Sequence, residues 1–463
     1  MSVSDKYMKT RNFGNKVRVM IVDDSVVVRG MFSKWLTGLA DIEVIATHRD
    51  GKIAVDNIAE DKPDVVLLDI EMPEMDGITA LPLLLEKCPS AKIIISSTLT
   101  TRNAEISLKA MSLGAVDYVA KPSGVGGLAG ATDFKQELLQ KIRVFGGVVD
   151  PSQAGGAGSS SFRASGAVRP SMAGATASRS RAHARTSLKA SSGADAPSSR
   201  KAPFTSKSPV TSKSPVTSKS PDTGKTPVVR KAPVIRSLRK NLAETAPSLV
   251  GHAKPKAGQG VGSFHAISKT LPKAVVIGSS TGGPPALLEI AKAIDSTIDH
   301  IPVFITQHMP ASFTKILAQH ISKVVNRVCR EAIDGELVKK GVIYVAPGGK
   351  HMSLTSTGLS VKIKLSDGPQ INFCKPSVDP LFMTAAGIYR KTLLAVILTG
   401  MGNDGTPGAG QIIEQGGTVL VQDEASSVVW GMPGAAVDAG VVCEILPLNK
   451  IGARVSRIVR GKV

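Results

Sequence analysis

The sequence predicts an α/β protein of two domains, each built on a doubly wound, mostly parallel sheet. Two observations predict this. Short apolar runs alternate with helix-like segments in both the N-terminal and the C-terminal parts of the chain, and the runs are almost continuous in Val, Ile and Leu. Strands of a parallel sheet are buried on both faces, which accounts for such runs. A long segment rich in Ser, Pro, Ala and Gly separates the two parts.

The first domain is predicted at 17–145, after an N-terminal extension of residues 1–16. Five apolar runs, each followed by a helix-like segment, are the predicted strands: VRVMIV (17–22), IEVIAT (42–47), DVVLLD (64–69), AKIIIS (91–96) and AVDYVA (115–120). Five β–α repeats imply a parallel sheet with helices on both faces, a (βα)5 fold.

A disordered linker is predicted at 146–271, where the composition cannot bury enough apolar surface to offset chain entropy. This segment contains three tandem hexads of the TSKSPV type, from Thr205 to Asp222. Residues 151–272 hold 20 Lys and Arg against 3 Asp and Glu, so most of the net charge of +20 lies there. The basicity therefore indicates a solvated spacer or an electrostatic arm for anionic lipid or nucleic acid, and it says little about the folded domains.

The second domain is predicted at 272–463, again as alternating strands and helices. Its predicted strands are KAVVIGS (273–279), PVFITQH (302–308), VIYVAP (342–347), LLAVILT (393–399) and GTVLVQD (417–423). The four cysteines of the chain show no CxxC spacing, which disfavours a disulfide framework or a zinc site. The sequence has no signal peptide and no apolar stretch long enough to span a membrane, so a cytoplasmic location is expected.

Acidic and polar residues follow four of the predicted strands of the first domain. Asp23 and Asp24 follow the first strand and Asp69 ends the third, while Ser97 and Lys121 follow the fourth and fifth. The carboxyl ends of parallel strands share one edge of the sheet, where ligands bind. Three carboxylates there require a hard cation such as Mg²⁺, and a hydroxyl and a lysine could hold phosphate oxygens.

With these residues the first domain resembles a response-regulator receiver domain. The resemblance implies that Asp69 accepts a phosphoryl group, with Ser97 as the switch hydroxyl and Lys121 as the phosphate partner. The Ser-Ser-Thr run at 96–98 leaves a slip of one residue open for the hydroxyl. The implied Mg²⁺ ligands are Asp23, Asp24, Asp69 and the backbone carbonyl of Glu71.

Ser280 lies between a predicted strand and a helix that begins near Gly282 and Gly283. A helix N-terminus favours an anion, so this loop suits either a phosphate site or a serine whose attack on a carbonyl creates an oxyanion. His308 ends the next strand, and Asp404 follows the strand 393–399. An imidazole can deprotonate the serine while a carboxylate orients the imidazole, so the three residues together favour a catalytic triad.

Several motifs of the second domain resemble the catalytic domain of CheB methylesterases. They are GSSTGGPPAL, TQHMPASFT, YVAPGGKHM, KPSVDPLF, ILTGMGNDG and QDEASSVVWGMPGAA. The resemblance implies Ser280 as nucleophile, His308 as base and Asp404 as the orienting acid. Thr281 and Met401 are the implied oxyanion and pocket residues. Ser279 departs from the family pattern, in which alanine is expected.

The implied activity is a phosphorylation-activated methylesterase that hydrolyses glutamate methyl esters on chemoreceptors and deamidates receptor glutamines. A chemotaxis histidine kinase is the implied phosphodonor, and the protein is expected in the cytoplasm near receptor arrays. Mg²⁺ is expected in the receiver domain only, and neither specific nucleic-acid binding nor membrane insertion is expected. The alternatives are a response regulator with a DNA-binding output and a scaffold without catalysis.

Overall fold

The structure is a computed structural model of the chain. It describes residues 16–98, 100–121, 127–148, 264–358 and 360–462, and for 127–133 it describes the backbone only. The predicted N-terminal extension and most of the predicted linker, including its hexad repeats, lie outside the described residues.

The N-terminal domain contains a five-stranded parallel sheet in the order β2-β1-β3-β4-β5. The predicted (βα)5 fold is confirmed, and the fifth strand begins two residues later than its apolar run. The strands are β1 (Val17–Val22), β2 (Ile42–His48), β3 (Val65–Asp69), β4 (Lys92–Thr98) and β5 (Asp117–Lys121).

Five helices cover the two faces of this sheet: α1 (Val26–Leu36), α2 (Gly51–Asp61), α3 (Gly77–Lys87), α4 (Thr101–Ser112) and α5 (Gly127–Phe145). Side chains of α1 and α5 pack with Val19 and Ile21, whereas side chains of α2 and α3 pack with Met20 and Val22. Successive side chains of a strand point to opposite faces of the sheet, so alternate residues of β1 contact different helices. Both are buried, which accounts for the continuous apolar runs.

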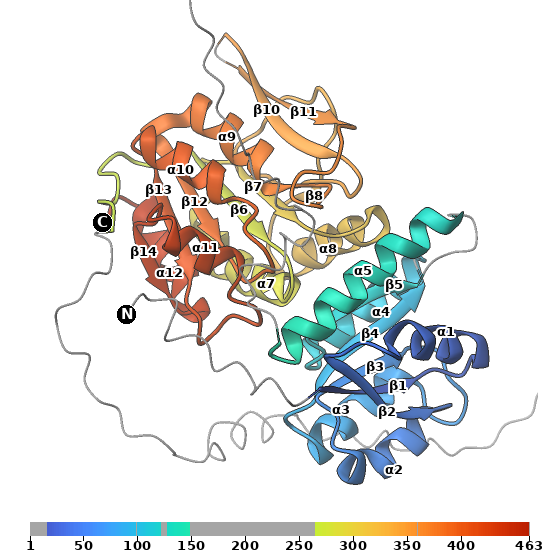
Figure 1. Cartoon of the computed structure of the whole chain (residues 1–463). Helices are drawn as coiled ribbons and strands as arrows, with labels where there is room; N and C mark the ends of the chain where they lie inside the picture. Colours follow the sequence, from blue (N-terminus) through green and yellow to red (C-terminus); the bar gives the residue numbers. More distant parts are fainter. Residues whose placement is uncertain (1–15, 99, 122–126, 149–263, 359, 463) are drawn as a thin grey trace, which may run out of the picture. The chain divides into compact units, whose positions relative to one another are not determined.

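The C-terminal domain contains a seven-stranded sheet in the order β14-β13-β12-β6-β7-β9-β8, with every neighbouring pair parallel. Its strands are β6 (Ala274–Ser279), β7 (Val303–Gln307), β8 (Cys329–Glu331), β9 (Ile343–Val345), β12 (Leu393–Ile397), β13 (Thr418–Gln422) and β14 (Glu444–Leu446). The five predicted strands are all present. An antiparallel hairpin, β10 (His351–Thr357) and β11 (Ser360–Ser366), forms a separate two-stranded sheet (Figure 1).

Helices cover both faces of the larger sheet. One face carries α7 (Gly283–Ile294), α8 (Ala311–Val324) and α12 (Leu448–Val459), and the other carries α9 (Val378–Tyr389), α10 (Thr406–Glu414) and α11 (Met432–Asp438). Two short 3₁₀ helices follow α7 and α9, at Asp295–Thr297 and Arg390–Thr392. With its faces covered, the sheet has its carboxyl edge free to carry functional loops.

The last residues of the predicted linker lie along the C-terminal domain. The backbone amide of His265 donates to the carbonyl of Val442 at 3.0 Å, and that of Ser268 donates to Thr418 Oγ1 at 3.0 Å. His265 and Ser268 therefore have partners in the C-terminal domain that the composition of this segment did not indicate. Among the helices of the described ranges, we find none long and apolar enough to cross a membrane.

Candidate functional site

Three neighbouring strands of the C-terminal sheet bring the predicted triad residues together. Strand β6 lies between β12 and β7, and the register pairs Ser279 with Gln307. Ser280 and His308 are the next residues along these two strands, and Asp404 follows β12 at the start of α10. All three residues line one cavity. The structure thus gathers them at a single sheet edge, as the sequence predicts.

The turn that carries Ser280 is fixed by its backbone. Its amide donates to the carbonyl of Thr399 at 3.0 Å, and its own carbonyl accepts from the amide of Gly283 at 2.7 Å and from Gln307 Nε2 at 2.8 Å. A Cβ atom at Gly283 would lie only 2.0 Å from Gln307 Oε1, so the close approach requires glycine. The serine is therefore held rigidly at the tip of β6.

Ser279 has a partner that explains why the departure from alanine is tolerated. Its buried hydroxyl donates to Gln307 Oε1 at 2.7 Å. Gln307 is thereby hydrogen-bonded at both ends of its amide and links the two strands behind Ser280. These hydrogen bonds offset the cost of burying the two polar side chains. The sequence alone gave no reason to single out Gln307.

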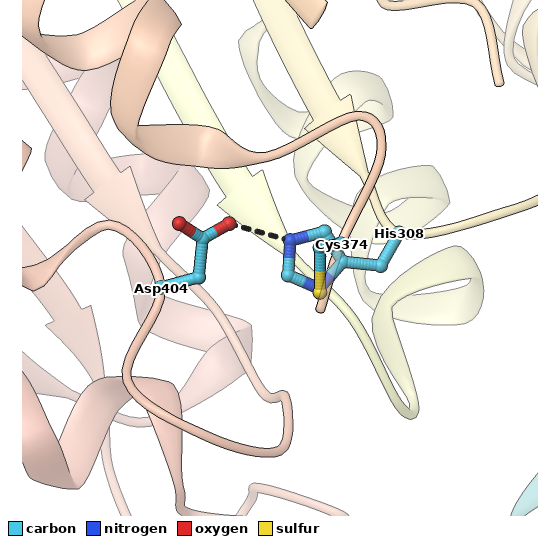
Figure 2. Close-up of side chains that lie close together, drawn as sticks. All are labelled: His308, Cys374 and Asp404. Carbon is cyan, nitrogen blue, oxygen red and sulfur yellow. Dashed lines mark hydrogen bonds and ion pairs between the residues drawn. The ribbon is translucent and has the colours of Figure 1, made fainter. Parts of the chain in front are cut away.

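His308 and Asp404 form a close pair (Figure 2), with His308 Nε2 2.7 Å from Asp404 Oδ2. Asp404 is 2% exposed and accepts further hydrogen bonds from Ser377 Oγ at 2.7 Å and the amide of Val378 at 2.6 Å. Asn372 Nδ2 lies 3.2 Å from its other oxygen. Ser377 and Val378 begin α9, so the carboxylate also lies at the positive end of a helix.

These contacts set the charge state of Asp404. Burial raises its pKa, but the hydrogen bond and positive charge of His308, with the donors at the start of α9, outweigh that effect, so the net pKa is lowered. Asp379, a neighbouring carboxyl in the first turn of α9, has its pKa raised to about 7 by burial and by the charge of Asp404. Of the two carboxyls, Asp404 therefore holds its negative charge more firmly, and that charge faces His308.

Cys374 contacts the other nitrogen of the same imidazole, with Sγ 3.3 Å from His308 Nδ1 (Figure 2). Burial lowers the pKa of His308, but the charge of Cys374 and the hydrogen bond to Asp404 outweigh burial, and the net pKa is raised. Sequence reasoning missed Cys374, which directly precedes the KPSVDPLF motif. Nothing in its spacing from His308 connects the two residues.

Ser280 makes no side-chain hydrogen bond to His308 among the described residues, although both line the same cavity. Thr281 and Met401 line that cavity too, and Thr281 is buried with its carbonyl bound to Thr399 Oγ1 at 2.9 Å. Their expected oxyanion and pocket roles remain predictions. In apo enzymes the hydrogen bonds of catalysis are often looser than in the substrate complex.

The predicted acidic cluster of the N-terminal domain also comes together. Lys121 Nζ lies 2.7 Å from Asp23 Oδ2 and 2.8 Å from Asp69 Oδ1. Asp23, Asp24 and Asp69 each offer a carboxylate oxygen within 4.8 Å of the others, and Asp24 is exposed while the other two are buried. Burial raises the pKa of Asp69 to about 6 despite the charge of Lys121. These three carboxylates could hold a divalent cation.

The loop after Asp69 folds back onto the end of β3. Gly77 donates from its amide to the carbonyl of Ile70 at 2.9 Å, and a Cβ atom at Gly77 would lie 2.0 Å from the carbonyl oxygen of Asp69. Glycine is needed at this point because no side chain fits. Glu71 lies on the same loop with its side chain exposed, and its expected role as a carbonyl ligand remains a prediction.

The register of β4 distinguishes Ser96 from Ser97. Asp69 pairs with Ser96 across β3 and β4, and Lys121 pairs with Thr98 across β4 and β5. Residues two apart point to the same side of a strand, so Ser96 shares a side with Asp69 and Lys121, and Ser97 points to the other side. The Ser96 hydroxyl is buried and has no hydrogen-bond partner within the described part of the chain, whereas that of Ser97 donates to the carbonyl of Thr98 at 3.2 Å.

Both domains of the chain match known protein families. Residues 19–132 match the response regulator receiver domain, and residues 275–455 match the CheB methylesterase domain. A protein-glutamate methylesterase/protein-glutamine glutaminase from Rhodopseudomonas palustris (strain BisB5) is 43% identical over 446 residues, covering 96% of this chain and 94% of the relative. The chain belongs to the protein-glutamate methylesterase/protein-glutamine glutaminase family.

Another relative and a solved structure are also similar to this chain in sequence. The protein-glutamate methylesterase/protein-glutamine glutaminase 1 of Paramagnetospirillum magneticum (strain AMB-1) is 39% identical to this chain, and the similarity covers 96% of each chain. The crystal structure of the Thermotoga maritima CheB methylesterase catalytic domain is 40% identical, covers 41% of this chain and all of its own, and has a TM-score of 0.40. The two domain matches identify a receiver domain and an esterase domain in this chain. Membership of the methylesterase/glutaminase family favours a hydrolase over the alternatives of a DNA-binding output or a scaffold without catalysis.

Proposed function

We propose that this methylesterase/glutaminase acts on glutamate methyl esters and glutamines of chemoreceptors and is activated by phosphorylation of Asp69. The observation that carries the catalytic part is the His308–Asp404 pair, which shares one cavity with Ser280 at the ends of three adjacent strands. Methanol release from methylated receptor membranes, with and without acetyl phosphate, tests the substrate and the switch together. No methanol above background in either condition would refute the proposal.

The proposed chemistry uses side chains of the esterase domain. Asp404 holds Nε2–H of His308, so Nδ1 is the nitrogen that takes the proton of the Ser280 hydroxyl. The Ser280 oxygen attacks the ester carbonyl, and the tetrahedral intermediate expels methanol with the proton returned by His308. Water then hydrolyses the acyl-enzyme by the same route and leaves the glutamate carboxyl. A glutamine side chain would react alike, with ammonia as the leaving group.

The surroundings of Asp404 favour this route because they are arranged before the substrate arrives. Three donors besides His308 fix the carboxylate, and the carboxylate fixes the imidazole. When His308 becomes an imidazolium in the transition state, the negative charge beside it needs no reorientation. Thr281 and the start of α7 are the proposed donors to the oxyanion.

Phosphorylation is proposed to occur on Asp69 of the receiver domain, with a chemotaxis histidine kinase as the phosphodonor. The donor set fits Mg²⁺, since carboxylates of Asp23, Asp24 and Asp69 converge there and two of them are buried. Bound Mg²⁺ would neutralise charge on the transferred phosphoryl group. Lys121 is positioned to hold a phosphate oxygen, and the register makes Ser96 the better candidate than Ser97 for the switch hydroxyl.

Asp69→Asn is expected to abolish activation by acetyl phosphate while basal turnover remains. Acetyl phosphate with Mg²⁺ should raise the turnover of the wild type above its basal rate. Asp56→Asn is the matched control, because Asp56 is an exposed carboxylate on α2 that pairs with Lys52. Activation of the Asp69→Asn variant equal to the wild type would contradict the assignment of the phosphoacceptor.

We also propose that the enzyme works in the cytoplasm beside receptor arrays, where both substrate and kinase would be found. The proposal rests on the family to which the chain belongs. Fluorescent protein fused to the chain should form foci at receptor clusters and become diffuse in cells that lack receptors. Diffuse fluorescence in both strains would contradict association with arrays.

A further inference from the structure

Cys374, His308 and Asp404 form a cluster that the esterase chemistry does not fully use. One ligand atom from each residue lies within 4.8 Å of the others. Thiolate, imidazole and carboxylate together are the donor set that a thiophilic divalent cation prefers. We propose that Cys374 Sγ and His308 Nδ1 form a binding site for Zn²⁺, through which the metal inhibits the esterase.

The distances suit two ligands of one ion. A thiolate lies about 2.3 Å and an imidazole nitrogen about 2.0 Å from zinc, so tetrahedral geometry separates the two ligand atoms by roughly 3.5 Å. In this structure Cys374 Sγ and His308 Nδ1 are 3.3 Å apart. Both side chains line the cavity, which would admit an ion and the water or hydroxyl ligands that complete its coordination.

Asp404 lies where it would support the histidine ligand and would not itself bind the metal. It binds Nε2 of His308 at 2.7 Å, on the side of the ring away from Nδ1 (Figure 2). Metal-bound histidines usually donate their other ring nitrogen to a carboxylate, which fixes the tautomer and strengthens the ligand. The arrangement that prepares His308 for catalysis therefore also prepares it for a metal.

Cys374 differs from the other three cysteines of the chain. Cys88, Cys329 and Cys443 are buried, and burial raises the pKa of Cys329 to about 12. Cys374 is partly exposed at the cavity and contacts an imidazole. Of the four thiols it is therefore the one that can reach an ion from solvent while paired with a second ligand.

Inhibition follows from the atom that the metal would occupy. The lone pair of His308 Nδ1 is the proposed acceptor of the Ser280 proton, so a metal on that nitrogen blocks deprotonation of the serine. Binding would replace the proton shared between Nδ1 and the sulfur, and one proton would leave for solvent. The effect on turnover rests on the proposed role of His308, whereas binding itself does not.

The first experiment measures binding with Co²⁺, which substitutes for Zn²⁺ and shows a thiolate-to-metal absorption band in the near ultraviolet. Full-length protein is titrated in excess Mg²⁺, so that the oxygen ligands of the receiver domain are occupied and give no such band. The wild type should show the band, saturating at one Co²⁺ per chain. Cys374→Ser should lose it, and Cys329→Ser, a buried control, should keep it.

Asp404→Asn provides a second variant that keeps both proposed ligands. Its Co²⁺ band should remain while the affinity falls by about 10- to 100-fold, the usual effect of losing an outer carboxylate. A band of unchanged strength in Cys374→Ser would overturn the site. So would the absence of any thiolate band in folded wild-type protein at Co²⁺ far above the protein concentration.

The second experiment measures turnover of each protein against its own untreated rate, again in excess Mg²⁺. Zn²⁺ should inhibit methanol release by the wild type and by Cys329→Ser, and a chelator should restore it. In Cys374→Ser the Zn²⁺ concentration for half inhibition should rise by at least about tenfold. A Cys374-dependent Co²⁺ band without any inhibition by Zn²⁺ would overturn the inhibitory part of the proposal, and with it the assignment of His308 Nδ1 as the acceptor of the Ser280 proton, while the binding site itself would stand.

Discussion

Replacing Ser280 by alanine is expected to lower methanol release by a factor of at least about 10³, with the fold unchanged. The residues of a triad act as a unit, so loss of the nucleophile removes the covalent route altogether, and only binding and oxyanion contacts remain. The measurement is the initial rate of methanol release from methylated receptor membranes, made in the presence of acetyl phosphate so that the enzyme is in its activated state.

Ser279→Ala is the matched control for that experiment. It removes a hydroxyl from the adjacent position of the same turn, and with it one hydrogen bond to Gln307. The expected cost is about 1 kcal/mol of stability, and turnover should stay within about tenfold of the wild type. If Ser280→Ala kept turnover as high as Ser279→Ala does, another group would have to be the nucleophile.

Asp404→Asn is expected to lower turnover by about four orders of magnitude, as loss of the orienting carboxylate does in other triads. The amide carries no charge to support the imidazolium, and its NH₂ group can turn toward Nε2 and select the wrong tautomer of His308. Because Asp404 also binds Ser377 and the amide of Val378, thermal unfolding should show a lower midpoint. Turnover is therefore measured well below that midpoint.

The pH dependence gives an independent check on the same variant. His308 must be neutral to act as a base, so kcat/KM rises as the pH passes through its pKa. In the wild type that pKa is raised, in part by Asp404, so the ascending limb should lie above the ordinary histidine range near pH 6.5. Removing the carboxylate lowers the pKa, and the residual activity should rise at lower pH than in the wild type.

Asp299→Asn is the control for the Asp404 experiments, because it removes an exposed carboxylate that pairs with Arg327 at the surface. Such a pair contributes only about 0.2–1 kcal/mol, and neither the rate nor its pH profile should change. An Asp404→Asn enzyme with the turnover and pH profile of this control would show that the carboxylate has no part in the chemistry.

The strands of both sheets could be predicted because they are local features of the sequence. Runs such as AVVIGS and LLAVI are long enough to show that both faces of each strand are buried. Strands β8 and β14 could not be found in this way, because three residues are too few to show a pattern of buried and exposed positions. The hairpin of β10 and β11 lies outside the parallel sheet, and its alternating polar residues gave no continuous apolar run.

The positions of the principal residues proposed for the two sites were predictable for a related reason. Ser280, His308 and Asp69 stand at the ends of buried strands, where a doubly wound sheet gathers its functional groups. Cys374 and Asn372 were missed because they lie on the segment between the hairpin and α9, which no strand positions. Only the folded chain brings that segment against His308 and Asp404.

The sequence by itself determined that there are two α/β domains, and it determined which chemical groups their strand ends carry. The order of the strands was decided by the tertiary structure, because packing between distant segments makes β12 and β7 the neighbours of β6. The tertiary structure also decided which serine of the 96–97 pair lies in register with Asp69, and which nitrogen of His308 meets Asp404 and which meets Cys374. The pattern of apolar residues indicates which side of one segment is buried. Contacts between side chains far apart in the chain depend instead on how the folded segments are placed, to within about an ångström.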